Sequence, residues 1–159
     1  MSALPSAFVI DACVLIKLVL HEEDSALARE VVGGLLADPP AAIEIPDLAF
    51  AEFANVLSSK VRGGEITAAD ADKDFADLAA LELPSTPSAQ LGARALALAC
   101  AYRITAYDAC YVALAEWLGA TLLTADGKLA AALRGTEHAV LTLAACRPLE
   151  ARGDERAKG

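Results

Sequence analysis

The stretch ITAYDACYVALAEWLGATLLTAD, residues 104–126, combines a helical pattern with a short apolar run. Its first part is rich in small and apolar residues, and we predict a largely buried helix from Thr105 to about Leu118. The run TLLT at 121–124 then predicts a buried strand, and an acid, Asp126, follows two residues later. A helical pattern that passes directly into a strand favours an α/β fold.

The rest of the chain repeats this alternation of apolar runs and helical patterns. Further strands are predicted at 7–10, 42–45 and 139–143. Strands that alternate with helices are usually parallel and joined by helical crossovers, so we predict a parallel sheet. The further helices are predicted near 12–20, 24–37, 46–61, 67–80, 89–101 and 127–134.

Length and composition are those of one globular domain. The chain has 159 residues, 56% of them hydrophobic, which is enough for one good core and too short for two domains. We assign the domain to residues 1–148 and expect residues 149–159 to form a charged, mobile tail. The sequence has no signal-peptide pattern and no apolar run of about 18 residues, so we expect a cytoplasmic protein.

Charge and cysteine content argue against a non-specific nucleic-acid-binding surface and against a cysteine-containing zinc site. The formal net charge of −9 argues against indiscriminate adhesion to nucleic acid, so any chemistry on phosphates would need cations. No two cysteines form a CxxC pair, and none lies at zinc-site spacing from a histidine. We therefore expect reduced, mostly buried thiols at Cys13, Cys100, Cys110 and Cys146.

Four acids stand at positions where chemistry is expected. Asp11 and Asp126 follow predicted strands, and open α/β sheets bind ligands at the carboxyl ends of their strands. Asp108 lies three residues after Thr105, at the start of a predicted helix, and Glu52 lies within another helix. Each acid also has a structural interpretation, because acids cap helix starts and polar residues line the solvated side of a helix.

The conjunction of the four acids favours a functional role. A metal-dependent phosphodiesterase needs several carboxylates in one pocket, because hard divalent ions take oxygen ligands and clustered acids repel one another without them. The chain offers an acid after a strand, a glutamate within a helix, the pattern Thr-x-x-Asp at a helix start, and the pattern Thr-x-Asp after a strand.

These patterns and their order resemble the PIN domain family of nucleases, and in particular the VapC ribonuclease toxins of toxin–antitoxin pairs. The resemblance covers nearly the whole chain. The matching stretches are FVIDACVLIKLVL at 8–20, PDLAFAEFANVL at 46–57, ITAYDACYVALAEWLGATLLTAD at 104–126 and GKLAAAL at 127–133.

The resemblance implies a three-layer α/β/α fold and a site with assigned roles. The metal-binding and catalytic quartet would be Asp11, Glu52, Asp108 and Asp126, with the catalytic-site hydroxyl of Thr124 beside it. The implied cofactor is Mg²⁺ or Mn²⁺, and the implied activity is endoribonuclease hydrolysis of RNA phosphodiester bonds, leaving a 5′-phosphate and a 3′-hydroxyl. The implied partners are an RNA substrate, a cognate antitoxin laid across the site, and a second copy in a homodimer.

One residue departs from the family pattern. Many relatives have serine or threonine two residues after the first aspartate, where this chain has Cys13. A thiol is a weaker hydrogen-bonding group than a hydroxyl, so activity or metal preference is expected to change if that hydroxyl orients the site.

Three rival functions use the same residues. A haloacid-dehalogenase-type phosphatase needs a second aspartate at the position of Cys13 and is excluded there. A Mg²⁺-binding phospho-receiver domain is kept as the third-ranked interpretation, because it would want an acidic pair before its acceptor strand and only Asp11 follows the first strand. A PIN-fold module that only binds a partner stays open, although all four acids are present.

Overall fold

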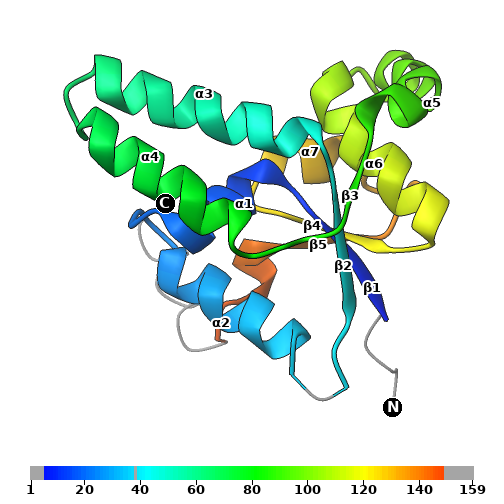
Figure 1. Cartoon of the computed structure of the whole chain (residues 1–159). Helices are drawn as coiled ribbons and strands as arrows, with labels where there is room; N and C mark the ends of the chain where they lie inside the picture. The colour runs from blue at the N-terminus through cyan, green and yellow to red at the C-terminus, as the bar shows by residue number, and fades with distance from the viewer. Residues whose placement is uncertain (1–5, 38, 149–159) are drawn as a thin grey trace, which may run out of the picture.

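The computed structural model describes residues 6–37 and 39–148, and its centre is a five-stranded, all-parallel sheet (Figure 1). The strand order is β3-β2-β1-β4-β5, so the predicted parallel sheet is confirmed. The strands are β1 (Ala7–Ile10), β2 (Ala42–Pro46), β3 (Ser85–Thr86), β4 (Thr121–Thr124) and β5 (Val140–Thr142).

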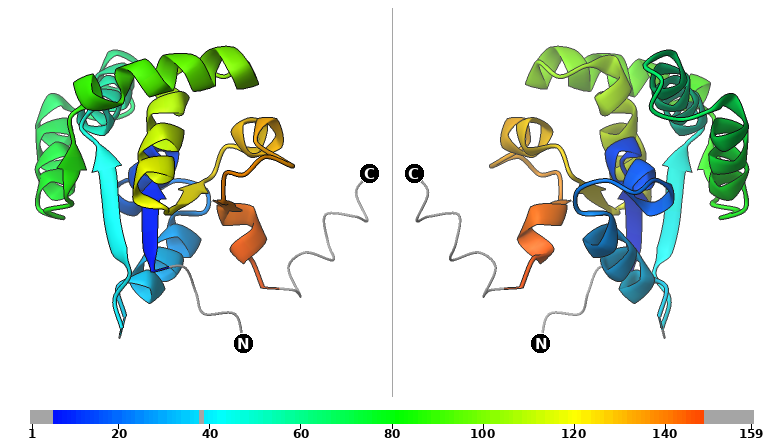
Figure 2. Two further views of the ribbon diagram at one scale, coloured as in Figure 1. Left: turned by 90° about the vertical axis from the view of Figure 1, so that its right-hand side faces the viewer. Right: turned by 90° about the vertical axis from the view of Figure 1, so that its left-hand side faces the viewer.

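Helices cover both faces of the sheet, which gives the three layers. Crossovers between parallel strands are right-handed, so connections that run in opposite directions along the sheet pass over opposite faces. Figure 2 shows α6 in front of the sheet in its left view and α1 and α2 in front in its right view. The helices are α1 (Ala12–Val19), α2 (Ser25–Leu35), α3 (Leu48–Arg62), α4 (Ala68–Ala79), α5 (Ser88–Tyr102), α6 (Ala106–Leu118) and α7 (Gly127–Ala132).

The sheet has a topological switch point between β1 and β4. The chain leaves β1 toward β2 on one side and leaves β4 toward β5 on the other, so the carboxyl ends of these two neighbours open into a crevice. Asp11 follows β1 at this point, and its backbone N–H donates to Leu123 O of β4 at 2.9 Å. The fold therefore sets the first aspartate beside the end of the neighbouring strand.

The core is built around the two central strands and α6. Val9, Ile10 and Leu123 are fully buried because helices cover both faces of the sheet. Residues 109–115 of α6 are all buried, which explains why this helix has apolar residues around most of its circumference. Burial of α6 against the sheet fixes its first turn beside the ends of β1 and β4.

The structure differs from the sequence prediction at the two ends of the sheet. The two-residue strand β3 was not predicted, because its signal is too short and prolines flank it. The predicted strand 139–143 is three residues long, and a 3₁₀ helix begins at Leu143 because Thr142 caps it. The predicted tail at 149–159 lies outside the described residues. Within the described ranges, no helix has the length and apolar character needed to cross a membrane.

Candidate active site

The four acids line one pocket at the switch point. The pocket has a volume of about 250 Å³. We call it the acidic pocket and define it by Asp11 from the end of β1, Glu52 from α3, Asp108 from α6 and Asp126 from the end of β4. Asn55, one turn after Glu52 on α3, also faces it. The fold thus brings together every acid that the sequence singled out.

Asp11 is the most deeply placed of these acids. Its exposed fraction is 5%, and it makes no capping hydrogen bond to the described helix α1, so capping does not explain it. Burial raises the pKa of the Asp11 carboxyl, the nearby charge of Asp126 adds to this, and hydrogen bonds from Thr124 and Cys13 partly offset it. The position therefore holds a carboxylate at an electrostatic cost.

Thr124 connects the first and last acids. Its fully buried hydroxyl donates to Asp11 Oδ2 at 2.7 Å and accepts from the backbone N–H of Asp126 at 3.0 Å. A hydroxyl can donate one proton while accepting another, so one side chain fixes both neighbours. Thr124 thus lies beside the acids and contacts both Asp11 and the backbone of Asp126.

Cys13 takes part in the same network. Its thiol donates to Asp11 Oδ2 at 3.2 Å, and its sulfur accepts from the backbone N–H of Ala125 at 3.2 Å. Burial, together with the charge of Asp11, raises the pKa of the Cys13 thiol to about 12, so the group is neutral at physiological pH. Cys13 therefore makes the contacts expected of a hydroxyl, through a weaker donor and a larger atom.

Glu52 has a partner that sequence reasoning missed. The phenol of Tyr111 on α6 is fully buried and donates to Glu52 Oε1 at 2.9 Å. Burial raises the pKa of the Glu52 carboxyl, the charges of Asp11 and Asp108 raise it further, and the Tyr111 hydrogen bond partly offsets these effects. The only available signal was that Tyr111 lies three residues after Asp108, on the same side of a helix.

The side chain of Asp126 caps a helix, whereas Asp108 is involved in capping through its backbone. Thr105 caps α6 by accepting from Asp108 N at 3.0 Å, so the capping contact uses the backbone of Asp108. Burial raises the pKa of the Asp108 carboxyl, Thr105 partly offsets this, and the charges of Asp11 and Asp126 raise it further. Asp126 does cap: its Oδ1 accepts from Lys128 N at 2.8 Å and Leu129 N at 3.2 Å.

The donor set fits a hard divalent cation. All four acids offer carboxylate oxygens, and the lining contributed by the described residues includes no lysine or arginine to balance their charge. Burial, with a smaller contribution from the neighbouring carboxylates, raises the pKa of Asp11, Glu52 and Asp108, so their charged forms are disfavoured without a cation. In the described chain, however, no three of these acids place an oxygen each within 4.8 Å of one another.

Comparison with known proteins gives the family. Residues 8–133 match the PIN domain family over most of the chain. The chain belongs to the PIN domain family. Ribonuclease VapC3 of Pyrobaculum aerophilum is 36% identical over 126 residues, covering 77% of this chain and 91% of that protein. The resemblance seen in the sequence is therefore confirmed at the level of the family.

Two solved structures support the PIN fold. PAE2754 from Pyrobaculum aerophilum is 22% identical with a TM-score of 0.63, covering 96% of this chain and 90% of its own. A toxin–antitoxin complex from Klebsiella pneumoniae contains a chain that is 19% identical with a TM-score of 0.60, covering 85% of this chain and 96% of its own. The predicted α/β/α architecture is confirmed by these likenesses.

Proposed function

We propose that this PIN domain is a metal-dependent endoribonuclease and the toxin component of a type II toxin–antitoxin pair. The observation that carries the proposal is the convergence of Asp11, Glu52, Asp108 and Asp126 on one pocket at the switch point. The 36% identity to a protein named as a ribonuclease supports the same reaction class. An acid cluster with no basic neighbour in its described lining would have little purpose in a purely structural module.

The proposed cofactor is Mg²⁺ or Mn²⁺, held by the four acids. When bound, such an ion supplies a water of lowered pKa and offsets negative charge on the scissile phosphate. The remaining work belongs to the chain. Thr124 fixes Oδ2 of Asp11, and Tyr111 fixes Oε1 of Glu52, so one oxygen of each acid is held by the protein. Asp126 is held by the two N–H groups that it caps.

The electrostatics of the acidic pocket also control where RNA can react. RNA carries negative charge on every phosphate, so the four carboxylates repel it until their charge is balanced. Burial already disfavours the charged forms of Asp11, Glu52 and Asp108. We infer that cation binding and loss of protons from these acids are coupled, and that the RNA backbone approaches only the cation-loaded pocket.

The direct experiment uses purified chain freed from any partner. The protein is incubated with total RNA in buffer containing Mn²⁺ or a chelator, and the ends of the fragments are analysed. We expect cleavage only with Mn²⁺, and fragments with a 5′-phosphate and a 3′-hydroxyl. Intact RNA in Mn²⁺ would overturn the proposal and favour the alternative, a PIN-fold module that only binds a partner.

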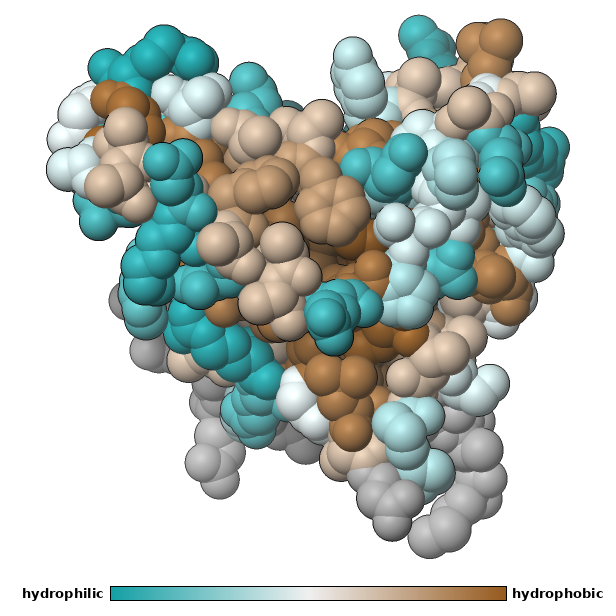
Figure 3. Space-filling view, in the orientation of Figure 1, coloured by the Kyte–Doolittle hydropathy of each residue, from teal (hydrophilic) through white to brown (hydrophobic). Residues whose placement is uncertain are grey.

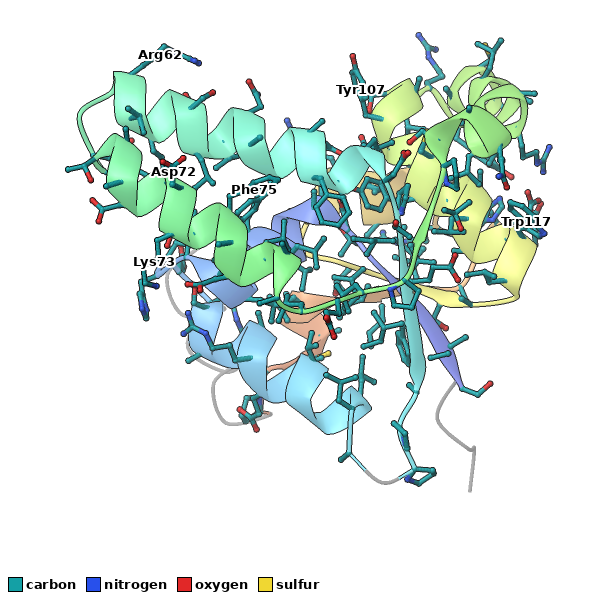
Figure 4. All side chains as sticks on the ribbon, in the orientation of Figure 1. Arg62, Asp72, Lys73, Phe75, Tyr107 and Trp117 are labelled. Carbon is teal, nitrogen blue, oxygen red and sulfur yellow. The ribbon has the colours of Figure 1, made fainter. Side chains whose placement is uncertain are left out.

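We propose an antitoxin as the protein partner. The acidic pocket suits an arginine, whose planar fork pairs with carboxylates. The α3–α4 hairpin adds an apolar groove of about 430 Å³, in which Phe75 lies between the two helices (Figure 4). Figure 3 shows apolar residues continuing across the centre of this face.

Co-expression with the product of an adjacent small gene tests this proposal. It should give a complex that no longer cleaves RNA, whereas a complex that still cleaves RNA would exclude blockage of the acidic pocket.

We also propose a homodimer. Three large side chains on α5 and α6 are well exposed: Leu96 at 63%, Tyr107 at 68% and Trp117 at 61%. Figure 4 labels Tyr107 and Trp117 on α6. Exposed apolar and aromatic groups of this size are typical of surfaces that bind another protein. Sedimentation of the purified chain should give twice the monomer mass, and Trp117→Ser should shift it toward the monomer. A monomeric wild-type chain would contradict this part of the proposal.

A further inference from the structure

A second cluster of metal-ligating side chains lies at the far end of α6. Glu116, Glu137 and His138 each place one ligand atom within 4.8 Å of those of the other two. Glu116 lies on α6 eight residues after Asp108, about 12 Å further along the helix axis. Glu137 and His138 lie between α7 and β5 (Figure 1). The cluster is therefore separate from the acidic pocket, and the proposed nuclease reaction does not use it.

His138 has a nitrogen that lacks a partner. Its side chain is only 6% exposed and lines a cavity of about 230 Å³ together with Glu116 and Glu137. Among the described residues, nothing forms a hydrogen bond with its buried Nε2. Leaving a buried polar atom without a partner is unfavourable, so a buried, unpaired nitrogen points to a missing ligand. The Tyr102 ring packs edge-on against the imidazole at 5.4 Å and restrains its plane.

The spacing around this nitrogen suits a metal ion. Glu137 Oε1 lies 3.7 Å from His138 Nε2, too far for a hydrogen bond. Ligands about 2.0–2.2 Å from a tetrahedral zinc ion lie roughly 3.3–3.6 Å from one another, so only a small adjustment is needed. We propose that His138 Nε2, Glu137 and Glu116 form a binding site for a Zn²⁺-type transition-metal ion. Imidazole with carboxylates is a donor set that suits such ions.

Arg94 is the natural competitor of the ion. Its Nε and Nη2 donate to the two oxygens of Glu116, at 2.6 Å each. The Arg94 side chain is half exposed, but its two parallel hydrogen bonds make this a bidentate pair, which is stronger than an ordinary exposed ion pair. An incoming ion must therefore displace Arg94 from Glu116 before all three ligands can bind it. Arg94 lowers the affinity of the site for two reasons. Its positive charge repels the ion, and its hydrogen bonds occupy the carboxylate of Glu116.

The expected consequence is structural. An ion bound here joins the end of α6 to the segment that enters β5, the strand at one edge of the sheet. The same segment follows α7, whose first turn is capped by Asp126 of the acidic pocket. Zinc binding should therefore raise the melting temperature of the protein, whether or not the chain cleaves RNA.

Metal binding at this site can be measured by NMR of the His138 side chain. The chain has two histidines, so the side-chain ¹⁵N spectrum of labelled protein is simple, and His21→Gln identifies the His138 signals. On titration with Zn²⁺ alone, we expect the Nε2 resonance of His138 to move while that of the exposed His21 stays in place. Because the signal belongs to His138, metal bound at cysteines or at the acidic pocket does not disturb the reading.

Matched variants then test the other ligands by the same signal. Glu116→Gln and Glu137→Gln should each weaken zinc binding at His138 by at least about tenfold. Loss of a residue that only supports a ligand already costs about 10–100-fold in metal affinity, so loss of a ligand should cost no less. Arg94→Ala should tighten it, and Glu30→Gln, an exposed change on α2, should leave it unaltered. A His138 Nε2 signal that stays in place when Zn²⁺ is added would overturn the proposal. Binding that is equal in all variants would also overturn it.

Discussion

The Tyr111 phenol donates a hydrogen bond to Glu52 Oε1 at 2.9 Å, joining a fully buried residue of α6 to an acid of α3 that is 59 positions away in the chain. Glu52 otherwise lies in a helix whose polar positions suggest an ordinary solvated stripe. The bond explains why Glu52 points into the acidic pocket. It also shows that the core of the domain supports the site directly.

Removal of this phenol should affect both stability and chemistry. Tyr111→Phe leaves Glu52 without its donor, and loss of a hydrogen bond to a charged group should cost about 1–3 kcal/mol of unfolding free energy. The bond lowers the pKa of Glu52, so its loss should raise that pKa and move the acidic limb of the cleavage pH profile to higher pH. Tyr102→Phe is the control. An unchanged pH profile with reduced stability would leave Tyr111 a purely structural residue.

The Cys13→Ser variant tests the departure from the family pattern. A serine hydroxyl is a stronger donor to Asp11 and a stronger acceptor from Ala125 N–H than the thiol is. We expect faster cleavage at fixed Mn²⁺, because Asp11 is then held more firmly. Cys100→Ser, at an exposed position, should have no effect. Equal or slower cleavage by Cys13→Ser would show that the thiol is a tolerated packing choice.

The buried acids should make the metal-free protein less stable as pH rises. The pKa of Asp11 is raised from its ordinary 3.8, mainly by burial, so the folded state keeps a proton that the unfolded chain has already released. Stability from this group is therefore full below pH 3.8 and is lost as pH rises through the folded-state pKa. Relative to wild type, Asp11→Asn should gain unfolding free energy with rising pH, as measured by urea titration in a chelator.

An acid on α4, Asp70, should change the pH dependence of stability in the opposite direction and serves as a control. Hydrogen bonds from Thr67 lower the pKa of Asp70, so this acid contributes stability above pH 3.8 that is lost on acidification. Asp70→Asn should therefore lose stability relative to wild type as pH rises, in contrast to Asp11→Asn. Parallel pH curves for wild type and Asp11→Asn would contradict the electrostatic description of the pocket.

Divalent metal should relieve the repulsion among the acids. At about 100 times its dissociation constant, a ligand that binds only the folded state adds about 2.7 kcal/mol, which raises the melting temperature by several degrees. Wild-type protein should melt higher in Mn²⁺ than in a chelator, and Asp11→Asn should gain less. An equal response of the two proteins would mean that Asp11 is not a principal ligand.

The sequence predicted the parts of the fold that have strong local signals. The uninterrupted apolar runs of β1 and β4 and the cap at Thr105 are local features, and all three appear where they were predicted. The contact of Tyr111 with Glu52 depends on how α6 packs beside α3, and no local pattern contains that information. The same holds for the approach of Cys13 to Thr124, which are 111 positions apart.

The acids themselves were predictable for a related reason. Asp11 directly follows β1 and Asp126 comes two residues after β4, so the parallel topology places both at the carboxyl ends of neighbouring strands. Asp108 was predictable as the start of a helix, but its direction into the pocket comes from the burial of α6. The strand β3, with two residues, is too short for any periodic pattern to reveal it.

The most direct measurement of the central claim is the rate of RNA cleavage in saturating Mn²⁺ by three variants of antitoxin-free protein. Asp11→Asn and Asp108→Asn keep side-chain size but remove a charge from the acidic pocket, and both rates should fall at least about 100-fold while the proteins stay folded. Asp72→Asn makes the same change at an exposed position on α4, and its rate should equal that of wild type (Figure 4). Cleavage that persists unchanged in Asp11→Asn and Asp108→Asn would contradict the assignment of the acidic pocket as the nuclease site.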